Sequence, residues 1–167
     1  MRRVLFATAA SAALLAGGPV SAATTTTTFQ VSATVLKTCS VAATALAFGN
    51  YTPGAGQATG TSTVNVFCTK TTPFTVALNG GATTGGTVAQ RLLGLGANTL
   101  QYNLFTTNAY ATVWGDGTGT SVTQSGAGAG LGSAVGLTVY GQLPDNATNQ
   151  GAVPGAYTDT ITVTVTY

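Results

Sequence analysis

The 167-residue sequence contains no histidine and no glutamate, and its only acidic side chains are three aspartates. The absence of histidine removes the usual general base and the usual partner of a catalytic nucleophile. Hydrolysis of a glycosidic bond needs two carboxylates at one site, and a calcium site needs a cluster of them. The aspartates are scattered at positions 116, 145 and 159. We therefore expect no catalytic residue, no metal site and no cofactor.

Charge of either sign is scarce. Beyond the N-terminal stretch, Lys37, Lys70 and Arg91 balance the three aspartates, so the formal net charge of that part is zero. No basic patch is present to predict contact with nucleic acid. The glycine-rich run 126–132 lacks the spacing and the following lysine of a nucleotide-binding loop. The sequence therefore predicts neither a nucleic-acid partner nor a small-molecule substrate.

The N-terminus has the pattern of a secretory signal over residues 1–22. Arg2 and Arg3 form the basic start, residues 4–16 the apolar middle, and Val20-Ser21-Ala22 the small-residue cleavage site. The apolar run is short for a membrane span. We expect cleavage after residue 22 or 23, which leaves about 145 residues, the length of one domain.

What the chain has in abundance is threonine, valine and glycine, which favour strands and turns. Over residues 157–167, every even position from Thr158 to Thr166 is threonine. The odd positions carry Tyr157, Ile161, Val163, Val165 and Tyr167, and Asp159 alone interrupts this apolar face. Because successive side chains of a strand point to opposite faces, the pattern predicts a strand. Such a strand needs a neighbour on each side, or it remains an open edge.

A second alternating segment lies near the other end of the chain. Five threonines at 24–28 precede residues 29–35, and the apolar positions of that stretch all have odd numbers. One face therefore carries Thr25, Thr27, Phe29, Val31, Ala33 and Val35. A threonine-rich stretch can also be a disordered tail or a glycosylated stalk. The alternation favours a strand for residues 29–35.

Between these two segments, shorter alternating stretches are separated by turn residues. They lie at 59–69, 73–78, 99–105 and 134–141, while 126–132 and 142–155 have the composition of loops. Short strands at such spacing predict an all-β sandwich or barrel. Cys39 and Cys68 are the two cysteines, and an even pair in an exported chain predicts a disulfide. A two-cysteine metal site would need histidine or acidic ligands, which the chain lacks near them.

A series of short motifs runs along the exported part of the chain. The threonine-rich start ends in Lys37-Thr38-Cys39, and residues 46–51 read Leu-Ala-Phe-Gly-Asn-Tyr. The motifs continue at 64–68, 73–81, Arg91, 100–105, Trp114-Gly115 and 139–144, and end with Gly-Ala-Tyr-Thr-Asp-Thr-Ile-Thr-Val at 155–163. Together they span nearly all of the exported part and resemble the spore coat U domain family, which overlaps with the subunits of archaic chaperone–usher pili.

This resemblance implies an immunoglobulin-like sandwich that lacks its final strand. A periplasmic chaperone would supply that strand first, and the N-terminal extension of the next subunit would later replace it. Residues 23–35 would then be the donor extension, with the six residues of the N-terminal alternating face filling a groove, and 36–167 the sandwich domain. The acceptor strand would carry Ile161, Val163, Val165 and Tyr167.

The resemblance also implies where the protein works. An outer-membrane usher and neighbouring copies of the chain, or related pilins, would be its further partners in a Gram-negative bacterium. The protein would pass through the periplasm to the cell surface, as a pilus subunit serving adhesion and biofilm formation. A self-contained secreted coat domain that forms no fibre is the alternative.

Overall fold

The computed structural model of the protein describes residues 18–167. The chain divides into two units, residues up to Thr34 and Val35–Tyr167. The predicted signal peptide, 1–22, lies outside the described residues except for positions 18–22. Residues 18–34 contain no helix or strand, and their side chains are exposed. No helix among residues 18–167 has the length and apolar character needed to cross a membrane.

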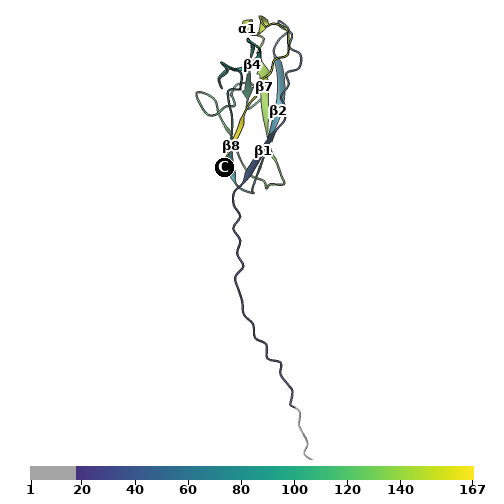
Figure 1. Ribbon diagram of the computed structural model, residues 1–167, viewed down its shortest axis with the longest axis vertical. Helices are drawn as coiled ribbons and strands as arrows, with labels where there is room; N and C mark the ends of the chain where they lie inside the picture. The colour runs from purple at the N-terminus through teal and green to yellow at the C-terminus, as the bar shows by residue number, and fades with distance from the viewer. Residues whose placement is uncertain (1–17) are drawn as a thin grey trace, which may run out of the picture. The chain divides into compact units, whose positions relative to one another are not determined.

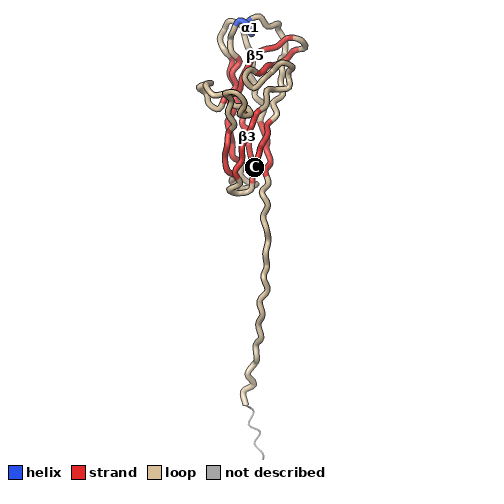
Figure 2. The backbone as a smooth tube through the Cα atoms, turned by 90° about the vertical axis from the view of Figure 1, so that its left-hand side faces the viewer, coloured by secondary structure: helices blue, strands red, loops and turns tan. Residues whose placement is uncertain are grey.

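The second unit is built almost entirely of strands, with one short helix at an end (Figures 1 and 2). The elements, in chain order, are β1 Cys39–Ala43, β2 Ala58–Cys68, β3 Pro73–Leu78, β4 Arg91–Leu95, β5 Asn98–Phe105, β6 Gln124–Ala127, β7 Val135–Leu143, α1 Ala147–Gln150 and β8 Val163–Thr166.

The strands form two antiparallel sheets. One has five strands in the order β1-β2-β7-β5-β4, and the other has three in the order β6-β3-β8. The long β2–β7 pairing, from Ala58↔Leu143 to Val66↔Val135, runs through the middle of the larger sheet. The all-β sandwich predicted from the sequence is confirmed.

Alternation of side chains places the core between the two sheets. The inward positions of β2, β3, β5 and β7 are apolar, and the residues between them face outward. The fully or almost fully buried side chains include Val64, Val66, Cys68, Phe74, Val76, Leu78, Leu100, Tyr102, Leu104, Trp114, Val139 and Leu143. Each such large apolar side chain stabilises the fold by about 1.5–3 kcal/mol relative to exposure.

Arg91 is also fully buried, at the start of β4. Its guanidinium donates hydrogen bonds to the carbonyls of Asn79 (2.8 Å), Leu78 (3.3 Å) and Trp114 (2.9 Å). A further bond goes to Oδ1 of Asn103 at 2.5 Å. Burial lowers the pKa of Arg91. These bonds satisfy the buried cation and join β3, β4 and β5 through one side chain.

Within the second unit, three predicted segments differ from the structure. Residues 157–162 lie outside β8, although their side chains alternate between half-buried and exposed as predicted. The loop predicted at 126–132 begins within β6, which pairs with β3 through its backbone. The small residues of β6 show no alternation from which a strand could be predicted. The loop predicted at 142–155 holds α1, which Asn146 caps by accepting a hydrogen bond from the Asn149 amide.

The strand predicted at 29–35 is absent from the structure of the single chain. A strand is stabilised by backbone bonds to a neighbouring strand, and residues 18–34 provide no such neighbour among themselves. Alternation therefore identified a segment suited to pairing, and the pairing itself needs a second strand.

Cys39 and Cys68 form a disulfide. They are directly opposite each other at the end of the β1–β2 pairing, so the bond joins the first residue of β1 to the last of β2. Cys68 is fully buried. The bond therefore attaches an edge strand to the core.

We predict that replacing both cysteines with serine lowers the free energy of unfolding by about 3.6 kcal/mol, the loop-closure estimate for a loop of this size. Urea unfolding of the periplasm-purified mature chain measures the change. An unchanged unfolding midpoint, or two free thiols found by mass mapping of the wild-type chain, would contradict this expectation.

Candidate strand-accepting groove

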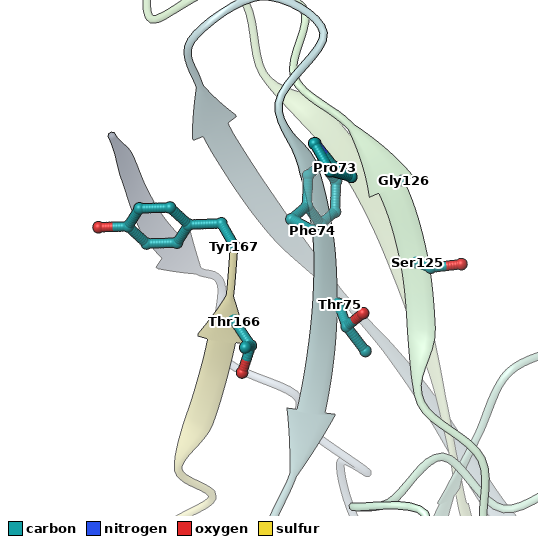
Figure 3. Close-up of a pocket in the computed structure, with 7 residues that line it drawn as sticks. All are labelled: Pro73, Phe74, Thr75, Ser125, Gly126, Thr166 and Tyr167. Carbon is teal, nitrogen blue, oxygen red and sulfur yellow. The ribbon is translucent and has the colours of Figure 1, made fainter. Parts of the chain in front are cut away.

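The three-stranded sheet ends at β8, which pairs with β3 on one side (Figure 3). The five-stranded sheet ends at β1, which pairs with β2 on one side. β1 and β8 lie near each other. Within the described second unit, two open strand edges therefore meet at one border of the sandwich. Backbone groups at such edges are free to pair with another strand.

The apolar side chains at this border are less well covered than those elsewhere in the core. Ile161, Val163 and Val165 pack against the core but remain half-buried. On the neighbouring strand β3, Val76 is completely buried. Val41 of β1 is 40% exposed. The core is thus continuous up to β8 and incompletely covered beyond it.

A cleft of about 960 Å³ continues this border. Its walls are residues 46–53, which follow β1, and residues 152–159, which precede β8. Leu93, Leu100 and Leu143 also line it. We call the open border between β1 and β8, together with this cleft, the acceptor groove. Asp159 is its one charged lining residue, so the groove suits an uncharged, apolar occupant.

The first wall is held by a close approach of backbones. Gly60 of β2 and Gly141 of β7 are paired opposite each other. A Cβ at Gly60 would lie 2.5 Å from the carbonyl oxygen of Ala47, and one at Gly141 2.8 Å from Leu46 Cδ1. A side chain at Gly60 would therefore displace the backbone of the 46–53 wall, and one at Gly141 would displace the packed side chain of Leu46. The absence of two side chains positions this side of the groove.

Asp145 fixes the same wall from its other end. Its carboxylate accepts hydrogen bonds from the Tyr51 hydroxyl (2.6 Å) and from the amides of Gly54 (3.0 Å) and Gly56 (2.9 Å). These bonds lower the pKa of Asp145 to about 2. Desolvation and the neighbouring carboxylate raise the pKa of Tyr51 to about 12, so its hydroxyl stays a donor. Asp145 therefore joins the loop after β1 to the loop after β7.

The end of the groove near α1 is ordered by Asn149, a fully buried side chain. Its amide oxygen accepts from the Gln101 amide at 2.8 Å. Its amide nitrogen donates to the carbonyls of Gln101 (2.9 Å) and Pro144 (2.7 Å). This role was not identified from the sequence, because a polar loop contains many similar residues. The capping pattern that begins at Asn146 was the one available signal.

The structure locates the predicted acceptor and donor residues as follows. Ile161, Val163 and Val165 line the border of the groove, while Tyr167 follows β8 and is 53% exposed. The residues on the predicted donor face, from Thr25 to Val35, are exposed. Their roles as donor and acceptor residues stay predictions.

Comparison with known proteins gives a family and a shared fold. The family model described as Spore Coat Protein U domain matches residues 25–164. A solved chain also resembles the protein, with a TM-score of 0.56 and 23% identity. It comes from the crystal structure of the CsuC-CsuE chaperone–tip adhesion subunit pre-assembly complex of archaic chaperone-usher Csu pili from Acinetobacter baumannii.

That likeness covers 80% of this chain and 41% of the other, so the chain spans about two fifths of the length of the protein it matches. At this identity the likeness shows a common fold. No curated protein matches the sequence.

The hydrogen bonds that Asp145 accepts from Tyr51, Gly54 and Gly56, here called the Asp145 clamp, predict how the stability of the fold changes in acid. The pKa of Asp145 falls from 3.8 to about 2 on folding, so the carboxylate stabilises the fold above pH 3.8, and this contribution disappears as the pH falls to about 2. In Asp145→Asn the unfolding midpoint in urea should be lower than wild type near pH 5 and should drop less between about pH 5 and about pH 2.5.

Tyr51→Phe is the matched control, because it removes the hydroxyl that forms the shortest of these bonds and keeps the carboxylate. It should show an intermediate acid response. Equal drops in the wild type and in Asp145→Asn would mean that the clamp contributes nothing to the fold.

Proposed function

The chain belongs to the Spore Coat Protein U domain family, and we propose that it is a structural subunit of a surface pilus, assembled by a chaperone–usher pathway through donor-strand exchange. In this proposal residues 23–35 are the donor extension, and residues 36–167 are the domain that accepts a strand. The observation that carries it is the acceptor groove, where an incompletely covered core meets two open strand edges.

A strand placed beside β8 would provide both hydrogen-bond partners for its backbone and cover for its apolar side chains. It would pair with the free backbone groups of β8, and its alternate side chains would cover Ile161, Val163 and Val165. Pairing through backbone atoms provides affinity, and the pockets between side chains provide selectivity. Apart from Asp159, whose carboxylate is bonded within the domain, the residues that line the groove are uncharged, which favours apolar side chains at the inserted positions.

The extension of the same chain has the chemistry of such a strand. Phe29, Val31 and Val35 are 86%, 81% and 85% exposed, and they share one face when the backbone is extended. Burying side chains of this kind is worth roughly 1.5–3 kcal/mol each. Exposed apolar groups in regular alternation mark a surface that another protein covers. We propose that the acceptor groove of a neighbouring subunit covers them.

Before assembly, the groove would need a temporary strand. The similar chain was solved in a chaperone–subunit pre-assembly complex. We propose that a periplasmic chaperone fills the groove of this protein, and that an outer-membrane usher is the place where the next subunit replaces it. The signal-like N-terminus agrees with export to the periplasm. The fibre would then stand on the cell surface and serve adhesion and biofilm formation.

The role is structural and not catalytic in this proposal, and the aspartates support that view. Asp116 accepts from the Thr118 amide (2.9 Å) and hydroxyl (2.6 Å) within its own turn. Asp145 and Asp159 accept several bonds each, from backbone amides and from tyrosine hydroxyls. All three carboxylates therefore stabilise local structure.

We predict that Phe29→Asp and Val31→Asp each leave a subunit that folds with its chaperone and does not join another subunit. A carboxylate in the apolar groove would have to be neutralised or paired, at a cost of several kcal/mol. SDS-stable ladders from cells that carry each variant measure the assembly. Gln30→Asp and Ser32→Asp add the same charge on the opposite face and should form ladders close to those of the wild type.

Normal ladders from both inward variants would show that the exchanged strand lies elsewhere or does not exist. Failure of these variants to fold even with the chaperone would show that the extension completes its own domain. The self-contained coat domain would then be the correct description.

A further inference from the structure

The apolar pattern of the C-terminal strand does not determine its register, that is, which of its residues lies opposite which residue of β3. From Thr158 to Thr166 the sequence alternates threonine with another residue, and the alternating residues at 161, 163 and 165 are all β-branched and apolar. A shift by one residue would turn the apolar face to solvent, but a shift by two would preserve both faces. Hydrophobic patterning therefore leaves the two-residue register undetermined.

The pairing with β3 makes this ambiguity concrete. In the structure, Leu78 is opposite Val163, Val76 opposite Val165, and Thr75 opposite Thr166. A two-residue shift would place Ile161 opposite Leu78, Val163 opposite Val76 and Thr164 opposite Thr75. The same classes of side chain would meet in every pair. Figure 3 shows Thr166 on β8 and Thr75 on β3, neighbouring strands in the observed register.

Most bonds next to β8 do not distinguish the two registers either. Asn79 donates its amide to the carbonyl of Thr162 and accepts the Thr162 amide on its side-chain oxygen, at 3.2 and 2.9 Å. Gly94 and Thr158 exchange two backbone bonds. Backbone atoms of any residue in this segment could make these contacts. These bonds attach the segment to the sheets, but they do not determine which of its residues occupies each position.

Asp159 is the exception to the repeat. Its Oδ1 accepts from the amides of Ala82 and Thr83, both at 2.9 Å, and from the Thr83 hydroxyl at 3.0 Å. Its Oδ2 accepts from the Tyr102 hydroxyl at 2.7 Å. Burial opposes the charged carboxylate, but the bonds from Tyr102 and Thr83 outweigh it, so the pKa of Asp159 lies below its usual value.

The residues around the Asp159 carboxylate leave space for it and provide its hydrogen-bond donors. Gly81 has φ +93°, and a Cβ there would overlap Oδ2 of Asp159. Tyr102 lies on β5 of the five-stranded sheet, so Asp159 ties the segment before β8 to that sheet and to the loop after β3. A two-residue shift would carry the carboxylate about 7 Å along the strand direction. It would lose all four partners while still half-buried.

We infer that Asp159 is the positioning residue that fixes the register of the C-terminal strand, through its bonds to the 82–83 backbone, Thr83 and Tyr102. The register in turn decides which of the three β-branched residues stands at each level of the acceptor groove. This inference concerns the folded domain itself and holds whether or not the chain assembles into a pilus.

Engineered disulfides can read the register directly. Thr75→Cys with Thr166→Cys joins residues that are opposite in the structure. Thr75→Cys with Thr164→Cys joins residues that are opposite only after a two-residue shift, since diagonal neighbours about 7–8 Å apart are too distant for a disulfide. Each pair is expressed in the full chain, exported to the periplasm, and mapped by mass spectrometry. The intact Cys39–Cys68 peptide confirms folding.

With Asp159 present, the 75–166 linkage should form and the 75–164 linkage should be a trace. Asp159→Asn keeps the size of the side chain and removes its charge. The ratio of 75–164 to 75–166 linkage should rise about tenfold or more, the change expected from losing one charge-assisted hydrogen bond. Tyr102→Phe should raise the ratio less. Asp116→Asn, which removes a carboxylate that bonds to Thr118 within its own turn, should leave the ratio unchanged.

An unchanged ratio in folded Asp159→Asn chain would overturn the inference. Loss of both linkages in a chain that retains its Cys39–Cys68 bond would also overturn it, because the strand would then detach and not shift. Both linkages are formed within one chain, so the result is independent of whether donor-strand mutants assemble.

Discussion

The unpaired edge of β8 is the constraint on which the rest of this structure depends. A sandwich core needs cover along its whole width, and here the smaller sheet has three strands against five. The missing cover leaves Ile161, Val163 and Val165 half-buried beside the open edge of β1. A chain with so few charges has little means of protecting such an edge by repulsion. Covering the edge with a strand from another protein resolves both the apolar and the backbone requirement.

Polar residues preserve the shape of the groove while that strand is absent. Four side chains make several hydrogen bonds each, and each joins segments that hydrophobic contact alone would leave free to slide: Arg91 and Asn149, and the carboxylates of Asp145 and Asp159. A satisfied polar group specifies one arrangement, because any other would leave it without partners. Apolar alternation determines which face is buried, and these residues determine where each segment lies along the sheet.

The sequence predicted the strands whose residues alternate clearly, such as 59–69, 73–78 and 99–105, because the period of two is a direct property of extended backbone. It missed β6, whose glycine and alanine residues carry no alternating signal, and it extended β8 to 157 because side-chain alternation continues beyond backbone pairing. The bonds of Asp159 and Asn149 could not be predicted. Their partners come from segments that only the tertiary fold brings together, as with Gln101 and Thr83.

The most direct test of the central claim adds a synthetic peptide of residues 24–35 to the domain 36–167, followed by hydrogen exchange of the β8 amides. With an open β8 edge, the domain alone should aggregate or exchange rapidly at the amides of Val163 and Val165, which point away from β3. The peptide should yield a soluble one-to-one complex in which these two amides are protected. A domain that is a stable monomer without the peptide, with these two amides already protected, would contradict the central claim, because its sandwich would then be complete.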